Sequence, residues 1–486
     1  MERNNAMLAM KTKEICDAVQ GVWISGDPDK VSTGISTDSR TITPGEFFIP
    51  IKGENFDGNE YILKAVGRGA SGFFVQRGFV VKGIENRKDI AVIEVADPKY
   101  AMGDLAQVYL KKFNVQVIGV TGSNGKTSTK EMIASILEKA MPVLKNEGSF
   151  NNDIGVPLTL FKLTRLHKVL VIEIGMNHSG EIRRLVSICP PHIGVVTNVG
   201  EAHVEFFGSL DKIAEAKFEL LEQMTDKNLA VLNAEDKRVS EFAKRTKAEP
   251  VFFGTNGSKS TFWSSEIQFS NDPWGVSFKL HTPGGETDIF LPILGEHQVS
   301  NALAAAAAAW QVVPDLNIIK RGLESFKPAK MRMQLIPIKG FTLINDAYNA
   351  NPRSMASALD TLNQLTPKGR KMVVLGDMRE LGSQGEQAHR DIGERIAQTG
   401  DIACLITVGE AAQGIAQGAK DASMDPSRIF TCVNNQEAID ILKNDIKPGD
   451  LVLLKASRKL EFEKIANALI SWADESEENS HNPVKD

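Results

Sequence analysis

Cysteine is scarce in this chain of 486 residues, and the four that occur lie far apart. None of them forms a Cys-x-x-Cys pair, which excludes a zinc ribbon and argues against a framework of disulfides. No stretch of about 18 consecutive apolar residues is present, so the sequence holds no candidate for a membrane-spanning helix. The first residues lack the apolar segment of a signal peptide. We therefore expect a cytoplasmic protein that does not insert into membranes.

An excess of positive charge is also missing. The 56 lysines and arginines are outnumbered by 61 aspartates and glutamates, which leaves a net charge of −5. The general positive field that drives much nucleic-acid binding is therefore absent, and we expect no nucleic-acid partner. Hydrophobic residues make up 42% of the chain and charged residues 24%. This composition is typical of folded domains, and the length fits about three of them.

Short apolar runs alternate with helical patterns through most of the sequence. Continuous runs of this kind are typical of strands that are buried on both faces, as in parallel sheets covered by helices. The pattern therefore predicts the α/β class. The clearest runs are residues 115–120, 169–174, 193–199, 372–378 and 451–456.

Two breaks divide this pattern. The first is at residues 111–114, before a predicted strand, and the second is at residues 327–333, where a proline and several basic residues interrupt the chain. In the N-terminal part, the alternation in residues 47–53 predicts a strand, and the proline in it favours an edge position. The three predicted domains are a smaller α/β domain (1–112), a central domain with a parallel sheet (113–330) and a C-terminal Rossmann-like domain (331–486).

The strongest local signal is the glycine-rich turn TGSNGKTS, residues 121–128, between a predicted strand and a predicted helix. Glycines let backbone N–H groups converge on phosphate oxygens, and the helix N-terminus adds partial positive charge. Lys126 would reach the β- and γ-phosphates, and the Thr127 hydroxyl would bind Mg²⁺. Val120 stands where the strict phosphate-loop pattern has glycine, and Gly122 supplies the loop glycine instead. An ordinary strand–helix turn is the alternative.

Three further residues are candidates for chemistry. Glu173 ends an apolar strand, where a carboxylate is costly to bury unless it is paired or binds a metal. His203 follows another strand, at the edge of the sheet where ligand sites of α/β proteins gather. Lys217 lies on the apolar stripe of a helix, four residues after Ile213. It either extends outward to solvent or is held in the site with a depressed pKa. A structural role remains the alternative for each of the three.

The glycine-rich turn resembles the nucleotide loop of the Mur ligase family, whose members build amide bonds on peptidoglycan precursors. Single departures from the family pattern occur at Gln298, Met331 and Ala456, where the family has Asn, Gly and Gly. The resemblance extends over residues 33–463. The other matching segments are STDSR (36–40), NNDIGVP (151–157), NVGEAHVEFFGS (198–209), AKFE (216–219), GEHQVSN (295–301), DAYNANP (346–352), GDMRELG (376–382) and KASR (455–458).

The resemblance implies a role for each matching residue. Lys126, Glu173, His203 and Lys217 would be catalytic, and Thr127, Glu173, His203 and a CO₂-derived carbamate on Lys217 would hold Mg²⁺, with two ions expected. ATP would be bound by Gly122, Ser123, Asn124, Gly125, Lys126, Thr127, Ser128, His297, Asn301, Arg332 and Asp346. The other substrates would be bound by Ser39, Arg40, Asn151, Asn152, Tyr348, Asn349, Asn351, Ser457 and Arg458, with the uridine diphosphate on the first domain.

Within the family, the C-terminal segments indicate the substrate. Ligases that add the third amino acid carry DNPR-type and GDRD-type segments, neither of which occurs here. The resemblance therefore implies a monomeric, ADP-forming ligase that adds D-alanyl-D-alanine to UDP-N-acetylmuramoyl-tripeptide through an acyl phosphate. The alternatives are a ligase for the third amino acid, a folylpolyglutamate synthase, and a nucleotide-binding module without ligase activity. The third residue of the tripeptide stays open between diaminopimelate and lysine.

The candidate ATP residues lie on both sides of the break at residues 327–333. A reaction that joins ligands held by three domains requires those domains to come together, and a short joint can act as a hinge. We therefore expect an open form without ligands and a closed form with nucleotide and UDP-substrate, in which the C-terminal domain moves most.

Overall fold

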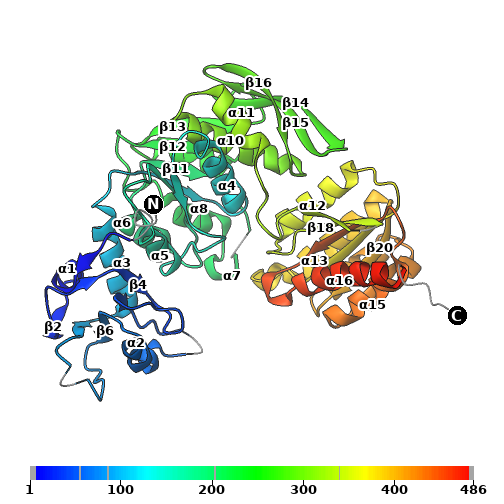
Figure 1. The fold of residues 1–486 in the computed structure, drawn as a ribbon. Coiled ribbons are helices and arrows are strands. Elements are labelled where there is room, and N and C mark those ends of the chain that lie inside the picture. Colours follow the sequence, from blue (N-terminus) through cyan, green and yellow to red (C-terminus); the bar gives the residue numbers. More distant parts are fainter. Residues whose placement is uncertain (1–6, 54–55, 85–86, 202–203, 339, 481–486) are drawn as a thin grey trace.

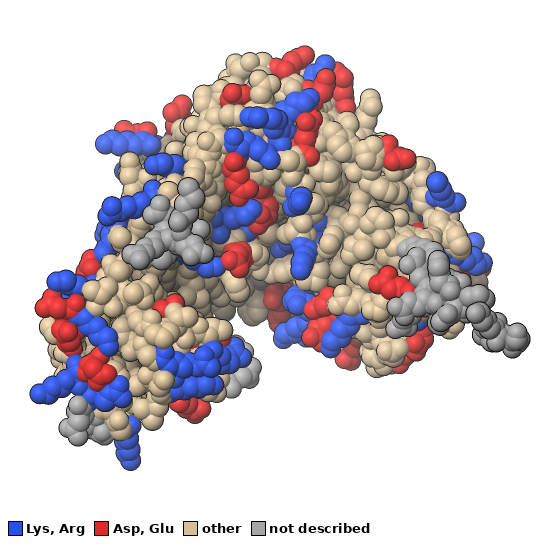
Figure 2. All heavy atoms as spheres, viewed as in Figure 1, with Lys and Arg blue, Asp and Glu red and all other residues tan. Residues whose placement is uncertain are grey.

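The computed structural model describes residues 7–480, apart from residues 54–55, 85–86, 202–203 and 339. Three α/β domains follow one another along the chain and form an arch, with the middle domain at its top (Figure 1). Acidic and basic side chains are interspersed over the visible face, which is hollowed between the two lower lobes (Figure 2). None of the helices in the described ranges is long and apolar enough to cross a membrane. The predicted three-domain α/β architecture is confirmed.

The N-terminal domain is built on a five-stranded sheet in the order β2-β7-β6-β5-β4, parallel except for β2. The edge position expected for the strand at residues 47–53 is wrong, because β5 lies between β4 and β6 and ends at Phe48, before Pro50. The elements are β1 (Met10–Lys11), α1 (Thr12–Ala18), β2 (Val22–Ser25), β3 (Val31–Ser32), β4 (Gly34–Ser36), β5 (Glu46–Phe48), the 3-10 helix η2 (Gly58–Tyr61), α2 (Ile62–Gly67), β6 (Gly72–Gln76), β7 (Ala91–Val95) and α3 (Pro98–Leu110).

Helix α3 fastens this domain to the middle one. It begins at an Asp97 cap followed by Pro98, and its apolar face is buried against α5 and α6. The Tyr109 hydroxyl donates to the Leu163 carbonyl at 2.8 Å. Lys99 pairs with Asp153 at 2.8 Å, directly after the predicted substrate residues Asn151 and Asn152. The N-terminal and middle domains are thus joined through a shared packed helix.

The middle domain has a nine-stranded sheet in the order β16-β15-β14-β13-β12-β11-β8-β10-β9. Strands β8 to β14 pair in parallel, and β14, β15 and β16 form an antiparallel extension. The elements are β8 (Gln116–Thr121), α4 (Lys126–Leu137), β9 (Val143–Lys145), α5 (Gly155–Leu160), β10 (Val169–Glu173), α6 (Glu181–Ile188), β11 (Ile193–Val196), α7 (Val204–Phe207), α8 (Leu210–Phe218), β12 (Leu229–Asn233), α9 (Lys237–Glu241), η3 (Phe242–Lys244), β13 (Glu249–Gly254), β14 (Phe262–Asn271), β15 (Trp274–Thr282), β16 (Gly285–Leu291), α10 (Glu296–Trp310) and α11 (Leu316–Glu324).

Central strands of this sheet are buried along their whole length, as the continuous apolar runs predicted. Every residue of β10 and β11 is buried. The six alanines at 304–309 are all fully buried within α10, which lets this helix pack closely against α4. The parallel strands place their carboxyl ends at one edge, where ligands bind in such sheets.

The C-terminal domain has a six-stranded sheet in the order β17-β18-β22-β19-β20-β21, parallel except for β17. It begins after the predicted joint at residues 327–333, which lies between α11 and β17. The elements are β17 (Gln334–Ile338), β18 (Phe341–Asn345), α12 (Pro352–Gln364), β19 (Lys371–Gly376), η4 (Gly382–Gln384), α13 (Gly385–Thr399), β20 (Ile402–Val408), α14 (Gln413–Asp421), η5 (Pro426–Arg428), β21 (Ile429–Cys432), α15 (Asn435–Asp445), β22 (Leu451–Lys455), η6 (Arg458–Leu460) and α16 (Glu463–Ser480).

Candidate active site

The glycine-rich turn connects β8 to α4, which begins at Lys126. Gly122 has a φ of 151°, and a Cβ atom on it would lie 1.9 Å from the Thr197 hydroxyl oxygen. Gly125 has a φ of 81°, and a Cβ there would lie 2.2 Å from the Asn301 side-chain oxygen. Both positions therefore require glycine. The first turn of α4 leaves backbone N–H groups without partners inside the helix, which suits a bound phosphate.

Lys126 lies folded back over this turn. Its ammonium group donates to the Gly122 carbonyl at 2.7 Å and to the Ser123 carbonyl at 3.2 Å. Burial lowers its pKa, Glu173 opposes that change, and Arg332 adds to it. A nearby anion would relieve the cost of this buried charge. The Asn124 side-chain nitrogen is buried without a hydrogen-bond partner among the described residues, so this donor of the turn is available to a ligand.

Glu173 lies at the end of β10 and is 1% exposed. Its carboxylate accepts from the Thr127 hydroxyl at 2.7 Å and, through the other oxygen, from the Asn151 amide at 2.7 Å. The carboxylate and hydroxyl oxygens meet beside the phosphate turn, and Mg²⁺ prefers such hard oxygen ligands. The donor set therefore fits a magnesium ion.

Lys217 is buried in α8, with 2% of its surface exposed. Its pKa is lowered well below 10.5, first by burial and then by the charge of Lys126. Within the described ranges its ammonium group has no hydrogen-bond or ion-pair partner. The alternative of a side chain that extends to solvent is therefore wrong. Two residues further on, buried Glu219 accepts from the backbone N–H groups of Gly180 and Arg183 and so caps α6.

The predicted ligand His203 lies outside the described residues. Among the residues that the structure describes, no group of three or more His, Cys, Asp or Glu side chains could hold a metal ion. Thr127, Glu173 and Lys217 are thus the members of the predicted magnesium set that the structure describes.

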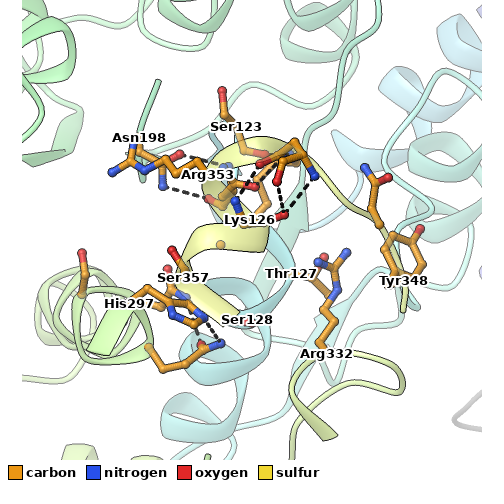
Figure 3. Close-up of a pocket in the computed structure, with 18 of the residues that line it drawn as sticks. Ser123, Lys126, Thr127, Ser128, Asn198, His297, Arg332, Tyr348, Arg353 and Ser357 are labelled. Atoms are coloured by element: carbon orange, nitrogen blue, oxygen red, sulfur yellow. Dashed lines mark hydrogen bonds between the residues drawn. The ribbon is translucent and has the colours of Figure 1, made fainter. Parts of the chain in front are cut away.

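At the other end of the turn, His297 lies near α12 of the C-terminal domain (Figure 3). Burial lowers the pKa of His297 to about 4. Its Nε2 lies 3.0 Å from the Gln298 amide nitrogen, and the Gln298 side-chain oxygen accepts from the Asn301 amide at 3.0 Å. Asn301 lies inside α10, which begins at Glu296. Its side-chain oxygen accepts from the Thr129 hydroxyl at 3.4 Å and lies close to Gly125.

The C-terminal domain supplies the opposite wall. Arg332 stacks over the Tyr348 ring, 4.2 Å from its centroid, and the Tyr348 hydroxyl contacts the Ser149 hydroxyl of the middle domain (Figure 3). Asp346 pairs with buried Lys455 at 2.5 Å, and the same lysine donates to the Asn349 carbonyl at 3.1 Å.

Asn351 joins the two walls directly. It caps α12, because its side-chain oxygen accepts from the Ser354 backbone N–H. Its side-chain amide donates to the Asn124 side-chain oxygen of the phosphate turn at 2.9 Å. Asn152 also lines the pocket, and its oxygen accepts from the Gly155 N–H at the start of α5. The middle and C-terminal domains together enclose a cavity of about 710 Å³.

Four predicted substrate residues lie away from this cavity. Ser39 is buried in the N-terminal domain, and Arg40 is exposed and paired with Asp38 at 2.8 Å, which holds the pKa of that carboxyl at about 2. The buried Ser457 hydroxyl accepts from the Arg379 backbone N–H, and Arg458 pairs with Glu463. The structure does not bring these residues to the phosphate turn.

Several lining residues escaped the sequence analysis as site candidates. Asn198 accepts from the Asn124 backbone N–H at 3.0 Å, and Arg353 lies above the turn. Asn198 falls inside a segment that matches the family and Arg353 directly follows another, so the family pattern was the signal that could have pointed to them. Asp236 and Ser357 also line the cavity, and nothing in their local sequence marks them.

The phosphate turn, the buried carboxylate and the two-domain cavity define a nucleotide-dependent enzyme that acts at a domain interface. Three matches to family descriptions span most of the chain: "Mur ligase family, catalytic domain" at residues 31–110, "Mur ligase middle domain" at 120–309, and "Mur ligase, glutamate ligase domain" at 331–458. The chain belongs to the Mur ligase family.

Relatives extend this similarity over the full length. The UDP-N-acetylmuramoyl-tripeptide–D-alanyl-D-alanine ligase of Bacillus subtilis is 35% identical, over 96% of this chain and 99% of its own. A crystal structure of MurF from Acinetobacter baumannii has a TM-score of 0.86 at 32% identity, covering 96% of this chain and 99% of that one. MurF of Thermotoga maritima, solved in complex with ADP, has a TM-score of 0.80 at 25% identity, covering 91% and 98%.

Proposed function

We propose that this protein is an ATP-dependent, ADP-forming ligase that joins D-alanyl-D-alanine to UDP-N-acetylmuramoyl-tripeptide in peptidoglycan synthesis. The observation that carries the proposal is the buried Glu173, held between Thr127 and Asn151 beside a phosphate turn and facing a second domain. The name of the Bacillus subtilis relative, at 35% identity over almost the whole chain, supports the pair of substrates.

The mechanism follows from the positions of the charged groups. The phosphate turn binds the ATP phosphates, and Lys126 with the turn's N–H groups neutralises charge on the transferred phosphoryl group. The terminal carboxylate of the tripeptide attacks the γ-phosphorus, which yields an acyl phosphate and ADP. The D-alanyl-D-alanine amine then attacks the acyl carbon, loses a proton and displaces inorganic phosphate. No side chain of the protein acts as a nucleophile.

Magnesium would be held by Glu173 and Thr127, with His203 as a further ligand proposed from the sequence. When bound, Mg²⁺ supplies charge neutralisation at the phosphate oxygens. We also propose that the site binds a second Mg²⁺ ion. Lys126 lies near enough to Glu173 for their charges to interact, so the cation and the ion held by the carboxylate would act on the same phosphate groups.

Lys217 is proposed to carry a carbamate. Only a neutral amine attacks CO₂, and burial and the nearby Lys126 both favour the neutral form. The attack forms an N–C bond and releases one proton, which leaves an anion in place of an amine. That anion would offset the charge of Lys126 and offer oxygen atoms to Mg²⁺. A structure with Mg²⁺ and ATP that contains an unmodified amine at full occupancy would refute the carbamate.

The N-terminal domain would bind the uridine diphosphate group. The exposed guanidinium of Arg40 offers a planar fork of donors of the kind that binds phosphate. The proposed boundaries remain 1–112, 113–330 and 331–486, and the proposed protein is a cytoplasmic monomer. ATP and D-alanyl-D-alanine would meet at the cavity between the other two domains.

ADP release measures this function directly. Purified protein is assayed with UDP-N-acetylmuramoyl-tripeptides that end in diaminopimelate or lysine, against D-alanyl-D-alanine and single amino acids. We expect ADP release only when a tripeptide and the dipeptide are both present. Turnover with the UDP-dipeptide and one amino acid would identify a ligase for the third residue. ATP hydrolysis that needs neither acceptor would identify a module that does not ligate.

A further inference from the structure

A second lysine of α4 is buried deeper than Lys126 but does not line the cavity. Lys130 lies four residues further along the same helix face, and its side chain is 0% exposed. Lysine is rarely buried completely unless its charge is paired. The ammonium group donates to the carbonyls of Asn146 at 2.6 Å and Gly148 at 2.9 Å, and it lies 2.9 Å from the Glu131 carboxylate. All three of its donors are thus used.

The carbonyl partners of Lys130 belong to the segment of residues 146–151, and Asn146 ties that segment to β10. Asn146 is 0% exposed, and its side-chain oxygen accepts from the Glu173 backbone N–H at 2.8 Å. Its side-chain nitrogen donates to the Phe150 carbonyl at 2.9 Å. One buried amide therefore fixes both the end of the strand and the far end of the segment.

The segment leads directly to the carboxylate of Glu173. Asn151 donates to this carboxylate at 2.7 Å, and its own carbonyl accepts from the Gly175 N–H at 2.9 Å. Thr127, at the start of α4, holds the other carboxylate oxygen. The carboxylate thus lies between α4 and the segment of residues 146–151, and Lys130 joins this helix to this segment.

We propose that Lys130 is a positioning residue for ligation: it fixes residues 146–151 against α4 and thereby sets the orientation of the Glu173 carboxylate, without contact to either substrate. The inference depends on the proposed function only in that Glu173 serves the reaction. A neutral side chain at position 130 would leave the carbonyls of buried Asn146 and of Gly148 without this donor, which is costly at the buried position. We therefore expect the segment to loosen and the carboxylate to lose its fixed orientation.

The test compares Lys130→Met with Lys139→Met, which removes an exposed lysine just after the same helix. In the ligand-free protein, hydrogen–deuterium exchange of the peptide that covers residues 146–151 should speed up at least tenfold in Lys130→Met alone. The Mg²⁺ concentration for half-maximal binding of a fluorescent ATP analogue should rise, and turnover should fall about 10- to 100-fold, as for lost outer partners of metal ligands. The Michaelis constant for D-alanyl-D-alanine should change less than threefold.

A second variant, Asn146→Ala, tests the same inference if Lys130→Met does not fold. Asn146→Ala breaks the same network from its other end without removing a charge, and Asn228→Ala is its control, because Asn228 ties a turn far from the cavity. We expect the Mg²⁺ requirement to rise in Asn146→Ala and not in Asn228→Ala. An unchanged Mg²⁺ requirement in a folded Lys130→Met, or in Asn146→Ala if Lys130→Met does not fold, would overturn the inference. Failure of the unmodified protein to ligate would instead refute the proposed function, since exchange and nucleotide binding still test Lys130.

Discussion

Replacing Lys126 by methionine separates catalysis from folding in this site. The change keeps the length of the side chain and removes its charge. In the folded protein the ammonium group is bound by two carbonyls of its own turn, at 2.7 and 3.2 Å, yet burial disfavours its charge. In Lys126→Met, loss of the two hydrogen bonds lowers the free energy of unfolding, whereas removal of a buried charge raises it. We therefore expect the free energy of unfolding to change by about 1 kcal/mol, a shift of a few degrees in Tm.

Turnover should respond far more strongly. During phosphoryl transfer Lys126 would leave the turn's carbonyls for the phosphate oxygens, so its charge acts chiefly in the transition state. Loss of such a contact lowers kcat on the order of 10³-fold, which corresponds to about 4 kcal/mol. ADP release and thermal unfolding are measured on the same preparation, with Lys139→Met as the control. Turnover within a few fold of the unmodified protein would remove Lys126 from its role, and a collapse of Tm would show that its role is structural.

Four other expectations follow from the geometry. The pKa of Lys217 is lowered in the folded protein, so at pH values between the lowered pKa and 10.5 the unfolded chain binds more protons than the folded one. In CO₂-free buffer the free energy of unfolding should therefore rise with pH over this window. Denaturant titrations of Lys217→Met should show a smaller rise. Gly125→Ala should raise the Michaelis constant for ATP by at least about tenfold. The added Cβ would lie 2.2 Å from the Asn301 oxygen, and the left-handed backbone at this position costs a residue with a Cβ about 1–2 kcal/mol. Unchanged kinetics would mean that the turn can rearrange. Arg40→Ala should raise the Michaelis constant for the UDP-substrate far more than that for ATP, whereas Arg87→Ala, which breaks a similar exposed pair with an aspartate, should change neither. Small-angle scattering should give a smaller radius of gyration with a non-hydrolysable nucleotide and UDP-tripeptide than without them, and equal radii would count against closure unless the free protein were already compact.

The parts of the fold set by local pattern were predictable from the sequence. Continuous apolar runs predicted fully buried strands, and β10 and β11 are buried throughout. The position of Lys217 on an apolar stripe marked it as unusual, and its burial decides between the two alternatives left open. The inner position of β5 was missed, because a proline two residues beyond the last paired residue does not disturb the ladder.

Residues that act through distant partners could not be predicted in the same way. Lys130 follows a polar turn and reads as a solvent-facing lysine, since its carbonyl partners lie 16 and 18 residues away. Asn146 reads as a turn residue, although its side chain holds the backbone of Glu173, 27 residues on. Their burial becomes visible only when the sheet order brings β9 beside β10.

The attachments of the three domains divide the site into a fixed part and a part that can move. Helix α3 packs on α5 and α6, so the N-terminal domain shares buried apolar surface with the middle domain. Among the described residues, hydrogen bonds such as Asn351 to Asn124 and Asn271 to Thr366 link the middle and C-terminal domains, and buried apolar residues of both domains belong to one cluster. Polar contacts of this kind exchange readily with water, whereas a packed helix does not. We therefore expect Glu173 and the phosphate turn to keep their relative positions, and the wall that carries Arg332 to be the one that opens to admit substrates.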